Sequence, residues 1–408
     1  MGIIRYKCVV IGCISVTLLC CFYIFESNSQ NGQDIEFKQD QMKGQYLDHS
    51  TGMKDTWNKR IQHLQEGCYS TDRKEQYKIK DQQAEAIFFQ SRKLNISVCK
   101  VAKAGSTFWA IVFLIVEKGI PANKAFSFPR NKIHALSAGF TKKLDSNPKP
   151  LTTKGIVVSR DPYSRLFSAF IDKYFLLRFA SIAHSLAQSL GKGFYKTEVG
   201  DCGYNISFQD FIDSVTTKAL HGSIINRHWS PVYAMCRVCD VGYQYVIQQE
   251  TMTQDTEHII DQLNISNEIK STLRLMFRGS GTNKTMGGVI KTMWGAIDNP
   301  VMRSCCSNKL AYFMKMWEGF KIQGYIRTNI SFPLSEFQTN DNVNVEDITK
   351  AVLAAMHTYP LSSTERKAQR RQALVTAYVG MPRRIIAQIQ EMYKMDFFLF
   401  GYDANPPS

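Results

Sequence analysis

Two copies of one local pattern restrict the fold of this chain. In each copy an apolar strand is followed by a polar loop and then by an apolar helix. Continuous apolar strands that alternate with helices are typical of a parallel sheet covered on both faces. The sequence therefore predicts an α/β fold with a parallel sheet. The strands are expected at residues 95–101 and 155–159, the loops at residues 102–107 and 160–165, and the helices at residues 108–118 and 166–179.

The chain after residue 207 is predicted to add helices to this sheet. Residues 279–299 are rich in Gly and Thr and are expected to form an irregular insertion. The apolar tail at residues 396–403 is expected to pack back on the sheet. The added helices are expected at residues 208–217, 257–277 with a break near Asn264, 345–358, 363–379 and 382–395.

The N-terminus carries an uncharged run from Cys8 to Phe25. At about 1.5 Å per residue, a helix of that length crosses the hydrocarbon core of a thin bilayer. Arg5 and Lys7 precede the run, which orients the N-terminus to the cytosol and the rest of the chain to the lumen. We expect an uncleaved transmembrane signal anchor. A cleaved signal peptide is the alternative, but bulky aromatic residues stand where a cleavage site needs small ones.

The charge balance indicates what the chain binds. It has 50 Lys and Arg against 35 Asp and Glu, a formal net charge of +15. A surplus of this size favours a polyanionic partner, either nucleic acid, an acidic membrane surface or an acidic polysaccharide. A lumenal location disfavours nucleic acid, because that compartment lacks it. Sulfated or uronate-bearing glycans are therefore the expected anion.

Glycosylation sequons agree with a lumenal location. We expect Asn95 to lie on a buried strand and to stay unmodified. The five sequons begin at Asn95, Asn205, Asn264, Asn283 and Asn329.

Seven cysteines follow the predicted anchor, and an odd number leaves at least one without an intramolecular partner. Cys99, on an apolar strand, is the predicted buried free thiol. Cys236 and Cys239 have the spacing of half a zinc site or of a redox pair. No second pair has that spacing, so structural disulfides are expected instead.

The first predicted loop carries groups that suit a phosphate. Backbone N–H groups at a helix N-terminus and the helix dipole both favour an anion. Gly105 allows close approach, Ser106 and Thr107 supply hydroxyl groups, and Lys103 supplies a positive charge. The GxxxxGK[ST] pattern of a Walker A loop is absent, so the loop alone is a weak indication.

The second loop adds Arg160 at the end of a strand and Ser168 eight residues later. Arginine binds phosphate through two N–H groups at once. The alternative is that Arg160 pairs with Asp161 or with a helix terminus on an ordinary surface.

The two loops together read VAKAGSTFW at residues 101–109 and VVSRDPYSRLFSAF at residues 157–170. With HWSP at residues 228–231 and YKMDF at residues 393–397, this pattern resembles the carbohydrate sulfotransferases. Those are type II Golgi enzymes that use 3′-phosphoadenosine 5′-phosphosulfate (PAPS). The branch it resembles contains the chondroitin/dermatan N-acetylgalactosamine 4-O-sulfotransferases and the glucuronyl 3-O-sulfotransferase. Ala102 departs from the proline usual in that family.

The resemblance implies a P-loop-like sulfotransferase domain with helical additions at residues 89–403. It implies a Golgi membrane protein of single-pass type II topology, with the catalytic domain in the lumen. The implied reaction is in-line transfer of the sulfuryl group from PAPS to a sugar hydroxyl, without a metal. The first-choice acceptor is O-4 of N-acetylgalactosamine in chondroitin or dermatan. The remaining segments are a cytosolic tail at residues 1–7, the anchor at residues 8–25 and a stem at residues 26–88.

Position by position, the resemblance also assigns ligands of the donor. Arg165 is expected to support the loop or the phosphate. The 5′-phosphosulfate would be held by Lys103, Ala104, Gly105, Ser106 and Thr107, and the 3′-phosphate by Arg160 and Ser168.

The sulfuryl group leaves an oxygen on which negative charge builds, and Lys103 is placed to stabilise that charge. The acceptor hydroxyl must lose a proton, so a base is needed. His134 and His228 are the two main candidates, and Glu250 is a third. Each of them has a structural alternative as a hydrogen-bonded or substrate-contacting residue.

Two other function classes are compatible with parts of the sequence. A lumenal kinase or phosphotransferase is disfavoured, because the Walker lysine and paired carboxylates for Mg²⁺ are missing. A non-catalytic lumenal glycan-binding membrane protein with the same fold is the alternative function. The basic cluster of Arg366, Lys367, Arg370 and Arg371 is read as a solvated helix face, with a glycan-binding patch as the alternative.

Overall fold

The chain divides into two compact units, residues 1–58 and residues 59–408, and the second unit contains the sheet and both predicted loops. The predicted cytosolic tail and anchor, residues 1–25, lie outside the described residues. Across the ranges that are described, no helix is both long enough and apolar enough to cross a membrane. The computed structural model describes residues 55–72, 79, 86–144, 151–263, 265–275, 282–297, 300–337 and 343–408.

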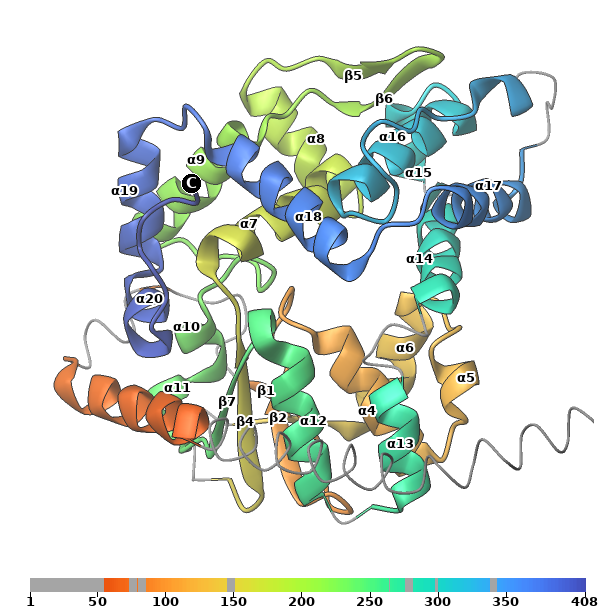
Figure 1. Ribbon diagram of the computed structural model, residues 1–408. Helices are drawn as coiled ribbons and strands as arrows, with labels where there is room; N and C mark the ends of the chain where they lie inside the picture. Colours follow the sequence, from red (N-terminus) through yellow and green to blue (C-terminus); the bar gives the residue numbers. More distant parts are fainter. Residues whose placement is uncertain are drawn as a thin grey trace, which may run out of the picture. The chain divides into compact units, whose positions relative to one another are not determined.

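A five-stranded sheet of order β3-β1-β2-β4-β7 forms the centre of the second unit (Figure 1). Its strands are β1 (Ile87–Ser91), β2 (Ile96–Cys99), β3 (Thr141–Lys143), β4 (Lys154–Ser159) and β7 (Tyr245–Gln248). β2 and β4 run parallel, as the repeated pattern predicts, and β7 adds a third parallel strand. β1 pairs antiparallel with both β2 and β3. The sheet is therefore parallel across β2, β4 and β7 and antiparallel at the β1–β3 edge.

Helices cover the sheet because its central strands are apolar on both faces. Val98, Ile156 and Val157 are buried completely. Helix α4 (Ser106–Lys118) contacts β1, and helix α12 (Met252–Gln262) contacts β7. α4 is apolar around most of its circumference, which is typical of a helix enclosed by protein. The α/β prediction is confirmed in this part of the chain.

The second strand–loop–helix unit ends in a π-helix. Helix α7 (Pro162–Phe170) starts with Asp161, whose side chain accepts a hydrogen bond from the Ser164 N–H, and has proline at its first position. The chain continues as a π-helix, η2 (Ile171–Phe175), and turns at Leu177, which has a φ of 56°. The helix predicted at residues 166–179 therefore begins four residues earlier and changes its winding. Short π-helices occur frequently at functional sites.

Most of the predicted helical additions are confirmed. α9 (Phe208–Leu220), α17 (Val345–Thr358), α18 (Ser363–Tyr378) and α19 (Arg383–Met392) match their predicted segments closely. The segment predicted at residues 257–277 is split into α12 and α13 (Asn267–Leu275). The other elements are α5 (Ala122–Ala125), α6 (Arg130–Ser137), α8 (Ala180–Ser189), β5 (Phe194–Thr197), β6 (Gly200–Tyr204), α10 (Val232–Cys236), α11 (Val238–Val241), α15 (Pro300–Cys305), α16 (Lys309–Ile322) and α20 (Lys394–Phe400).

The predicted irregular insertion at residues 279–299 is wrong for most of its length. Residues Thr282–Ile297 form helix α14, which packs against α6 and α17. Met286, Ile290 and Met293 are buried at helical spacing, so tertiary packing outweighs the weak helix propensity of Gly and Thr. Gly288 is required by close packing, because a Cβ atom there would lie 2.9 Å from the carbonyl oxygen of Phe128.

The apolar tail returns to the sheet, as expected. α20 buries Phe397, Leu399 and Phe400. The Gln248 side chain at the end of β7 donates to the Phe400 carbonyl over 2.9 Å. The Tyr402 hydroxyl lies 3.0 Å from the hydroxyl of Ser159, the last residue of β4. The C-terminal segment thus reaches the carboxyl ends of two parallel strands.

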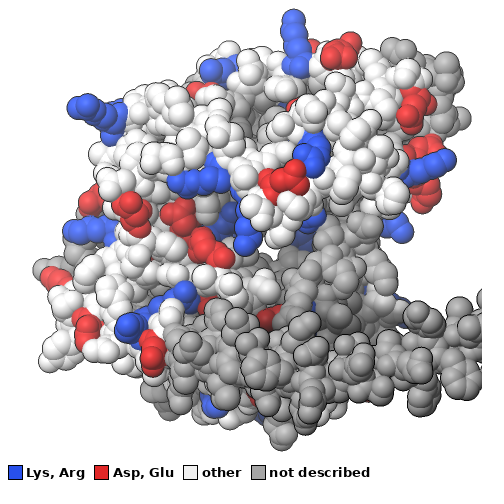
Figure 2. Space-filling view, viewed as in Figure 1, with Lys and Arg blue, Asp and Glu red and all other residues white. Residues whose placement is uncertain are grey.

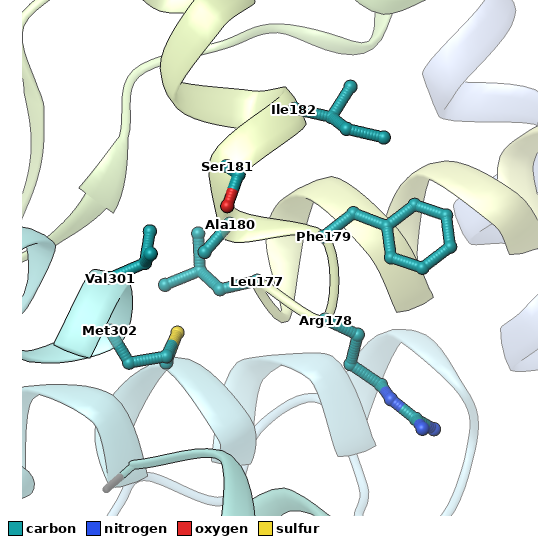
Figure 3. Close-up of a pocket in the computed structure, with 8 residues that line it drawn as sticks. All are labelled: Leu177, Arg178, Phe179, Ala180, Ser181, Ile182, Val301 and Met302. Atoms are coloured by element: carbon teal, nitrogen blue, oxygen red, sulfur yellow. The ribbon is translucent and has the colours of Figure 1, made fainter. Parts of the chain in front are cut away.

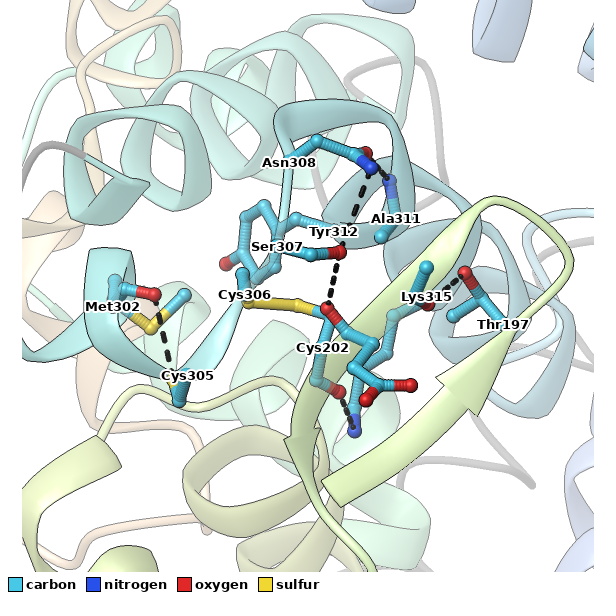
Figure 4. Close-up of a disulfide and its surroundings, with 12 residues drawn as sticks. Thr197, Cys202, Met302, Cys305, Cys306, Ser307, Asn308, Ala311, Tyr312 and Lys315 are labelled. Atoms are coloured by element: carbon cyan, nitrogen blue, oxygen red, sulfur yellow. Dashed lines mark hydrogen bonds between the residues drawn. A yellow bond between two sulfur atoms is a disulfide. The ribbon is translucent and has the colours of Figure 1, made fainter.

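Three disulfides link Cys68 to Cys239, Cys99 to Cys236 and Cys202 to Cys306. Structural disulfides were expected for Cys236 and Cys239, and both are confirmed. The prediction that Cys99 is the free thiol is wrong. An apolar strand pattern indicates that a cysteine is buried, but it does not show what lies opposite. The free cysteine of the described part is Cys305, which is buried next to the third disulfide (Figure 4).

A helix at residues 55–70 lies within the predicted stem. Arg60 pairs with Asp255 of α12 over 2.8 Å, and Cys68 is bonded to Cys239. Residues 60–68 are therefore held against the rest of the second unit through a covalent bond and an ion pair. The stem boundary at residue 88 stays a prediction.

Asn95 does not lie on a buried strand. It is exposed, with a φ of 53°, in the turn that precedes β2. Asparagine is among the few residues that adopt this conformation readily. Burial therefore gives no reason for Asn95 to stay unmodified, and Asn205 and Asn329 are exposed as well.

Candidate active site

The first loop joins β2 to α4 and turns twice through left-handed conformations. Lys103 has a φ of 66° and Gly105 a φ of 84°. A Cβ atom at Gly105 would lie 2.7 Å from the Met252 side chain, so only glycine fits here. Among the described residues, no side chain caps the start of α4, and its first turn has no acidic residue. The first N–H groups of α4 are thus available to an anion.

Two arginines of the second loop hold the first loop in place. Arg160 donates to the Lys103 carbonyl over 2.9 Å and to the Ser164 hydroxyl over 3.0 Å. Arg165 is completely buried and donates to the Ala102 carbonyl over 3.0 Å. Its two terminal nitrogens donate to the carbonyls of Ser230 and Arg227. Arg165 therefore supports the loop, which was one of its two expected roles.

Glu250 lies at the second loop. Its carboxylate accepts hydrogen bonds from the Asp161 N–H over 3.1 Å and from the Tyr402 hydroxyl over 3.0 Å. Both carboxylate oxygens are thus used near Arg160. Because both oxygens already accept hydrogen bonds, Glu250 is the weakest of the three candidate bases.

Asp172, on the π-helix, is the centre of the strongest charge cluster in the site. Its carboxylate lies 2.9 Å from the Lys103 ammonium group, within a ring of four cations. Four positive charges against one negative charge leave a local excess that would attract an anion. The other three cations are Arg130 at 3.3 Å, Lys173 at 3.3 Å and Arg178 at 3.6 Å.

Burial and charge set the protonation states in this cluster. Burial alone would raise the pKa of Asp172, but the four cations outweigh it and hold that pKa well below its ordinary value. Burial lowers the pKa of Lys103 to about 7, Asp172 opposes this shift, and Arg130 adds to it. Asp172 is therefore an anion at neutral pH, while Lys103 is poised between its charged and neutral forms.

His134 lies beside the first loop. Its Nε2 atom is 3.2 Å from the Thr107 hydroxyl. Its buried Nδ1 atom has no hydrogen-bond partner within the described ranges. Burial, and then the positive charge of Arg130, lower the pKa of His134 to about 4. The imidazole is therefore neutral at pH 7 and able to accept a proton.

His228 is held more firmly. Its Nδ1 atom lies 2.7 Å from the Asn226 side-chain oxygen, and its ring meets Phe179 edge to face at 5.0 Å. Burial, and then the charge of Lys173, lower its pKa to about 2. Because the Asn226 oxygen accepts only, the Nδ1 atom of His228 carries the proton and Nε2 keeps a lone pair.

The predicted site residues fall in one region at the carboxyl ends of β2 and β4. Ser106 is the buried first residue of α4, and Ser168 is half-buried on α7, two turns after Arg160. The structure brings Lys103, Thr107 and His134 together. The sequence prediction missed Asp172 and three of its cations, although an Asp-Lys pair inside an apolar helix was a visible signal. Figure 2 shows basic side chains around a hollow near the centre of one face.

These residues fit the proposed donor. A buried Gln249 oxygen has no partner among the described residues, and it points at Gly105, with 3.3 Å from it to an added Cβ. The open start of α4, the Lys103 ammonium group and this polar atom thus all lie at the first loop. No cluster of three or more His, Cys, Asp or Glu suited to a metal ion occurs in the described ranges.

The fold and the site define an α/β protein with an open helix start and a cluster of cations at the carboxyl end of a parallel sheet, the place where such sheets bind ligands. The chain belongs to the sulfotransferase family, whose sequence model matches residues 87–308, more than half of the chain. That match includes both loops, the π-helix and the two histidines.

Curated relatives agree with this family. The chain is 26% identical to carbohydrate sulfotransferase 12 of Mus musculus over 209 residues, which is 43% of this chain and 48% of that protein. It is 25% identical to carbohydrate sulfotransferase 11 of Danio rerio (43% and 53% covered) and 28% identical to carbohydrate sulfotransferase 9 of Homo sapiens (44% and 41% covered). The chain spans about half the length of these relatives. No solved structure gives a significant match.

Proposed function

We propose that this protein transfers the sulfuryl group of PAPS to a sugar hydroxyl of an anionic glycan. The observation that carries the proposal is the interlocked pair of loops, which presents Lys103 and the open start of α4 at the same place. Family membership supports the same reaction. PAPS supplies the sulfuryl group and leaves as the 3′,5′-bisphosphate.

Lys103 and the first turn of α4 would bind the 5′-phosphosulfate. Ser106 and Thr107 would add hydroxyl donors there, while Arg160 and Ser168 would bind the 3′-phosphate. Lys103 stabilises the negative charge that develops on the leaving oxygen. Lys173, the most enclosed of the other cations around Asp172, strengthens this effect because little water reaches it.

His134 is the proposed base for the acceptor hydroxyl. It is neutral at pH 7, contacts the donor loop through Thr107, and has an unpartnered nitrogen in the site. A bound anionic donor would offset the neighbouring cations and raise the pKa of His134 towards the range in which a base works well. His228, fixed by Asn226, is the second candidate for this role.

The acceptor has a place to bind beside the cation cluster. A cavity of about 260 Å³ lies between residues 177–182 and α15, where Val301 and Met302 form the opposite wall (Figure 3). Arg178 lines this cavity and also faces Asp172. Chondroitin or dermatan, with N-acetylgalactosamine O-4 as the acceptor atom, is the substrate we propose first. We place the protein in the Golgi membrane as a single-pass type II protein with a lumenal catalytic domain.

Sulfate transfer by the full-length chain in detergent tests this function. The protein is incubated with radiolabelled PAPS and a panel of desulfated glycans. Lys103→Ala is expected to abolish transfer, whereas Lys321→Ala, which removes a lysine paired with Glu318 on α16, is expected to retain it. Label on one glycan that is lost only in the Lys103 variant supports the enzyme and identifies its acceptor.

A non-catalytic glycan-binding protein predicts a different result. It would bind the glycan panel and transfer no label, even with donor binding intact. Absence of any binding of PAPS or of the bisphosphate would contradict the assignment of both loops.

A further inference from the structure

The Asp172 carboxylate has a position that its charge alone does not explain. It lies 2.9 Å from Lys103, the residue that the proposed function assigns to the donor, and both side chains are largely enclosed. A carboxylate next to an anion-binding lysine competes with the anion for that lysine. Such a carboxylate weakens donor binding unless it also stabilises the lysine in the donor-free protein.

The contacts of Asp172 show that it is held independently of Lys103. Arg130 approaches from α6, Lys173 is its neighbour on the π-helix, and Arg178 follows the π-helix. Three cations would still compensate the carboxylate if Lys103 moved away. In contrast, Asp172 is the only acidic group within ion-pair distance of Lys103 among the described residues. The pairing is therefore one-sided: Lys103 depends on Asp172, and Asp172 does not depend on Lys103.

We propose that Asp172 is a positioning residue, which holds the Lys103 ammonium group in the donor-free protein and releases it to the 5′-phosphosulfate when the donor binds. This inference rests on the proposed function. The three other cations keep the Asp172 carboxylate in place after the release. The exchange replaces one anionic partner of Lys103 by another, so the buried lysine has a counter-ion in both states.

The charge of Lys103 depends on that partner. Without donor, burial lowers the pKa of Lys103 to about 7 and Asp172 counteracts this. Removal of the Asp172 charge would therefore lower the pKa of Lys103 further, and more molecules would carry a neutral amine that binds phosphosulfate poorly. Removal of Arg130 would act in the opposite direction, because its positive charge lowers the pKa of Lys103. The other titratable or charged groups around the cluster are Lys173, Arg178, His134, His228 and Tyr312 of α16.

The test measures binding of 3′-phosphoadenosine 5′-phosphate, the product bisphosphate, to the full-length chain by calorimetry from pH 5.5 to pH 8.5. The compared quantity is the ratio of the variant Kd to the wild-type Kd, in which the titration of the ligand itself cancels. For Asp172→Asn we expect a ratio at or below one at pH 5.5, where Lys103 is charged in both proteins and the competing carboxylate is gone. From there the ratio should rise about tenfold, to a plateau above pH 7, for each unit by which the pKa of Lys103 falls. For Arg130→Gln we expect the alkaline limb of binding to move to higher pH.

Three controls separate this role from a structural one. Asp213→Asn removes a surface carboxylate that is also paired with an arginine, Arg384, and its ratio should stay near one at every pH. Asp172→Glu restores the charge and should flatten the ratio. In a Lys103→Ala background, Asp172→Asn should lose its pH-dependent effect, because the group that titrates is gone.

The outcomes distinguish this inference from the proposed function. If wild-type protein binds the bisphosphate and the Asp172→Asn ratio is the same at all pH values, the inference is wrong and the proposed function stands. If Asp172→Asn does not fold, Arg130→Gln decides, and an alkaline limb unmoved or moved to lower pH overturns the inference. If wild-type protein does not bind the bisphosphate, both are wrong.

Discussion

Arg165 offers the sharpest test of how the donor site is built. Its guanidinium group is completely buried and donates to three main-chain carbonyls, those of Ala102, Arg227 and Ser230. Arg165→Met keeps most of the side-chain volume and removes all of these donors. A buried acceptor left without a donor costs about 1–3 kcal/mol. The three carbonyls together would therefore cost about 3–9 kcal/mol.

The exposure of the three hydrogen bonds narrows the expected loss of stability. Only the hydrogen bond to Ser230 is fully buried, whereas those to Ala102 and Arg227 are partly accessible, so water can replace the missing donors there. We expect the free energy of unfolding to fall by about 3–5 kcal/mol. Donor affinity should fall as well, because the Ala102 carbonyl belongs to the loop that we propose binds the 5′-phosphosulfate. Arg165→Lys should give an intermediate loss, since an ammonium group cannot reach three carbonyls in a plane.

Urea unfolding under non-reducing conditions, followed by tryptophan fluorescence, measures the first quantity, and calorimetry with the bisphosphate measures the second. Arg384→Met is the matched control, because Arg384 is exposed and makes two hydrogen bonds to Asp213. It should leave both quantities unchanged within error. A loss below about 1 kcal/mol for Arg165→Met would refute the reasoning, since it would mean that these carbonyls do not depend on Arg165.

Three further predictions concern other parts of the chain. Non-reducing peptide mapping should find the disulfides Cys68–Cys239, Cys99–Cys236 and Cys202–Cys306. Among the cysteines after residue 25, one thiol, at Cys305, should react with maleimide only after denaturation; reaction in native protein would contradict its burial. Gly288→Ala should lower the free energy of unfolding by about 1–3 kcal/mol, because the added methyl group meets the Phe128 carbonyl. Gly287→Ala is the control: with open space around the added methyl group, it should leave the free energy of unfolding unchanged or raise it by up to about 1 kcal/mol. The acid limb of kcat/KM for PAPS, which reports the donor-free protein, should lie near pH 4 once the titration of PAPS itself is accounted for, because the base form of His134 is lost only as pH falls through about 4; a remaining limb near pH 6.5 would exclude His134 as the base.

The sequence predicts those strands and helices whose apolar pattern is contained in one continuous segment. The strands before the two loops, and the helices after them, are continuous apolar segments, so β2, α4, β4 and α7 could be placed within a few residues. α14 could not, because its stability comes from contacts with α6 and α17 rather than from its own Gly- and Thr-rich residues. Strand β1 was missed for a related reason: it follows a polar segment and pairs antiparallel, outside the repeated pattern.

The same distinction applies to the candidate site: residues on one continuous segment could be predicted, and residues that meet only in the folded chain could not. The residues of the first loop could be proposed from sequence because phosphate binding uses a contiguous segment at a helix start. The Asp172 cluster was not found, because its members meet only in the folded chain. Lys103 is 69 residues from Asp172, and Arg130 is 42 residues from it. No pattern along the sequence connects such positions, although an acidic residue inside an apolar helix indicates that a buried partner is needed.

The two loops and the His228 segment are parts of one fixed frame. Cys99, at the end of β2, is bonded to Cys236 at the end of α10. Arg165 joins the first loop to the carbonyls on both sides of His228, and Asp396 of α20 accepts the first two N–H groups of α10. A disulfide, a buried arginine and a buried carboxylate therefore restrain the backbone that surrounds the donor. Within this frame the Lys103 side chain has two alternative partners, the Asp172 carboxylate and, by our proposal, the 5′-phosphosulfate. Because preorganised charges cost no reorganisation during the reaction, such a frame favours catalysis in which only Lys103 changes its contact.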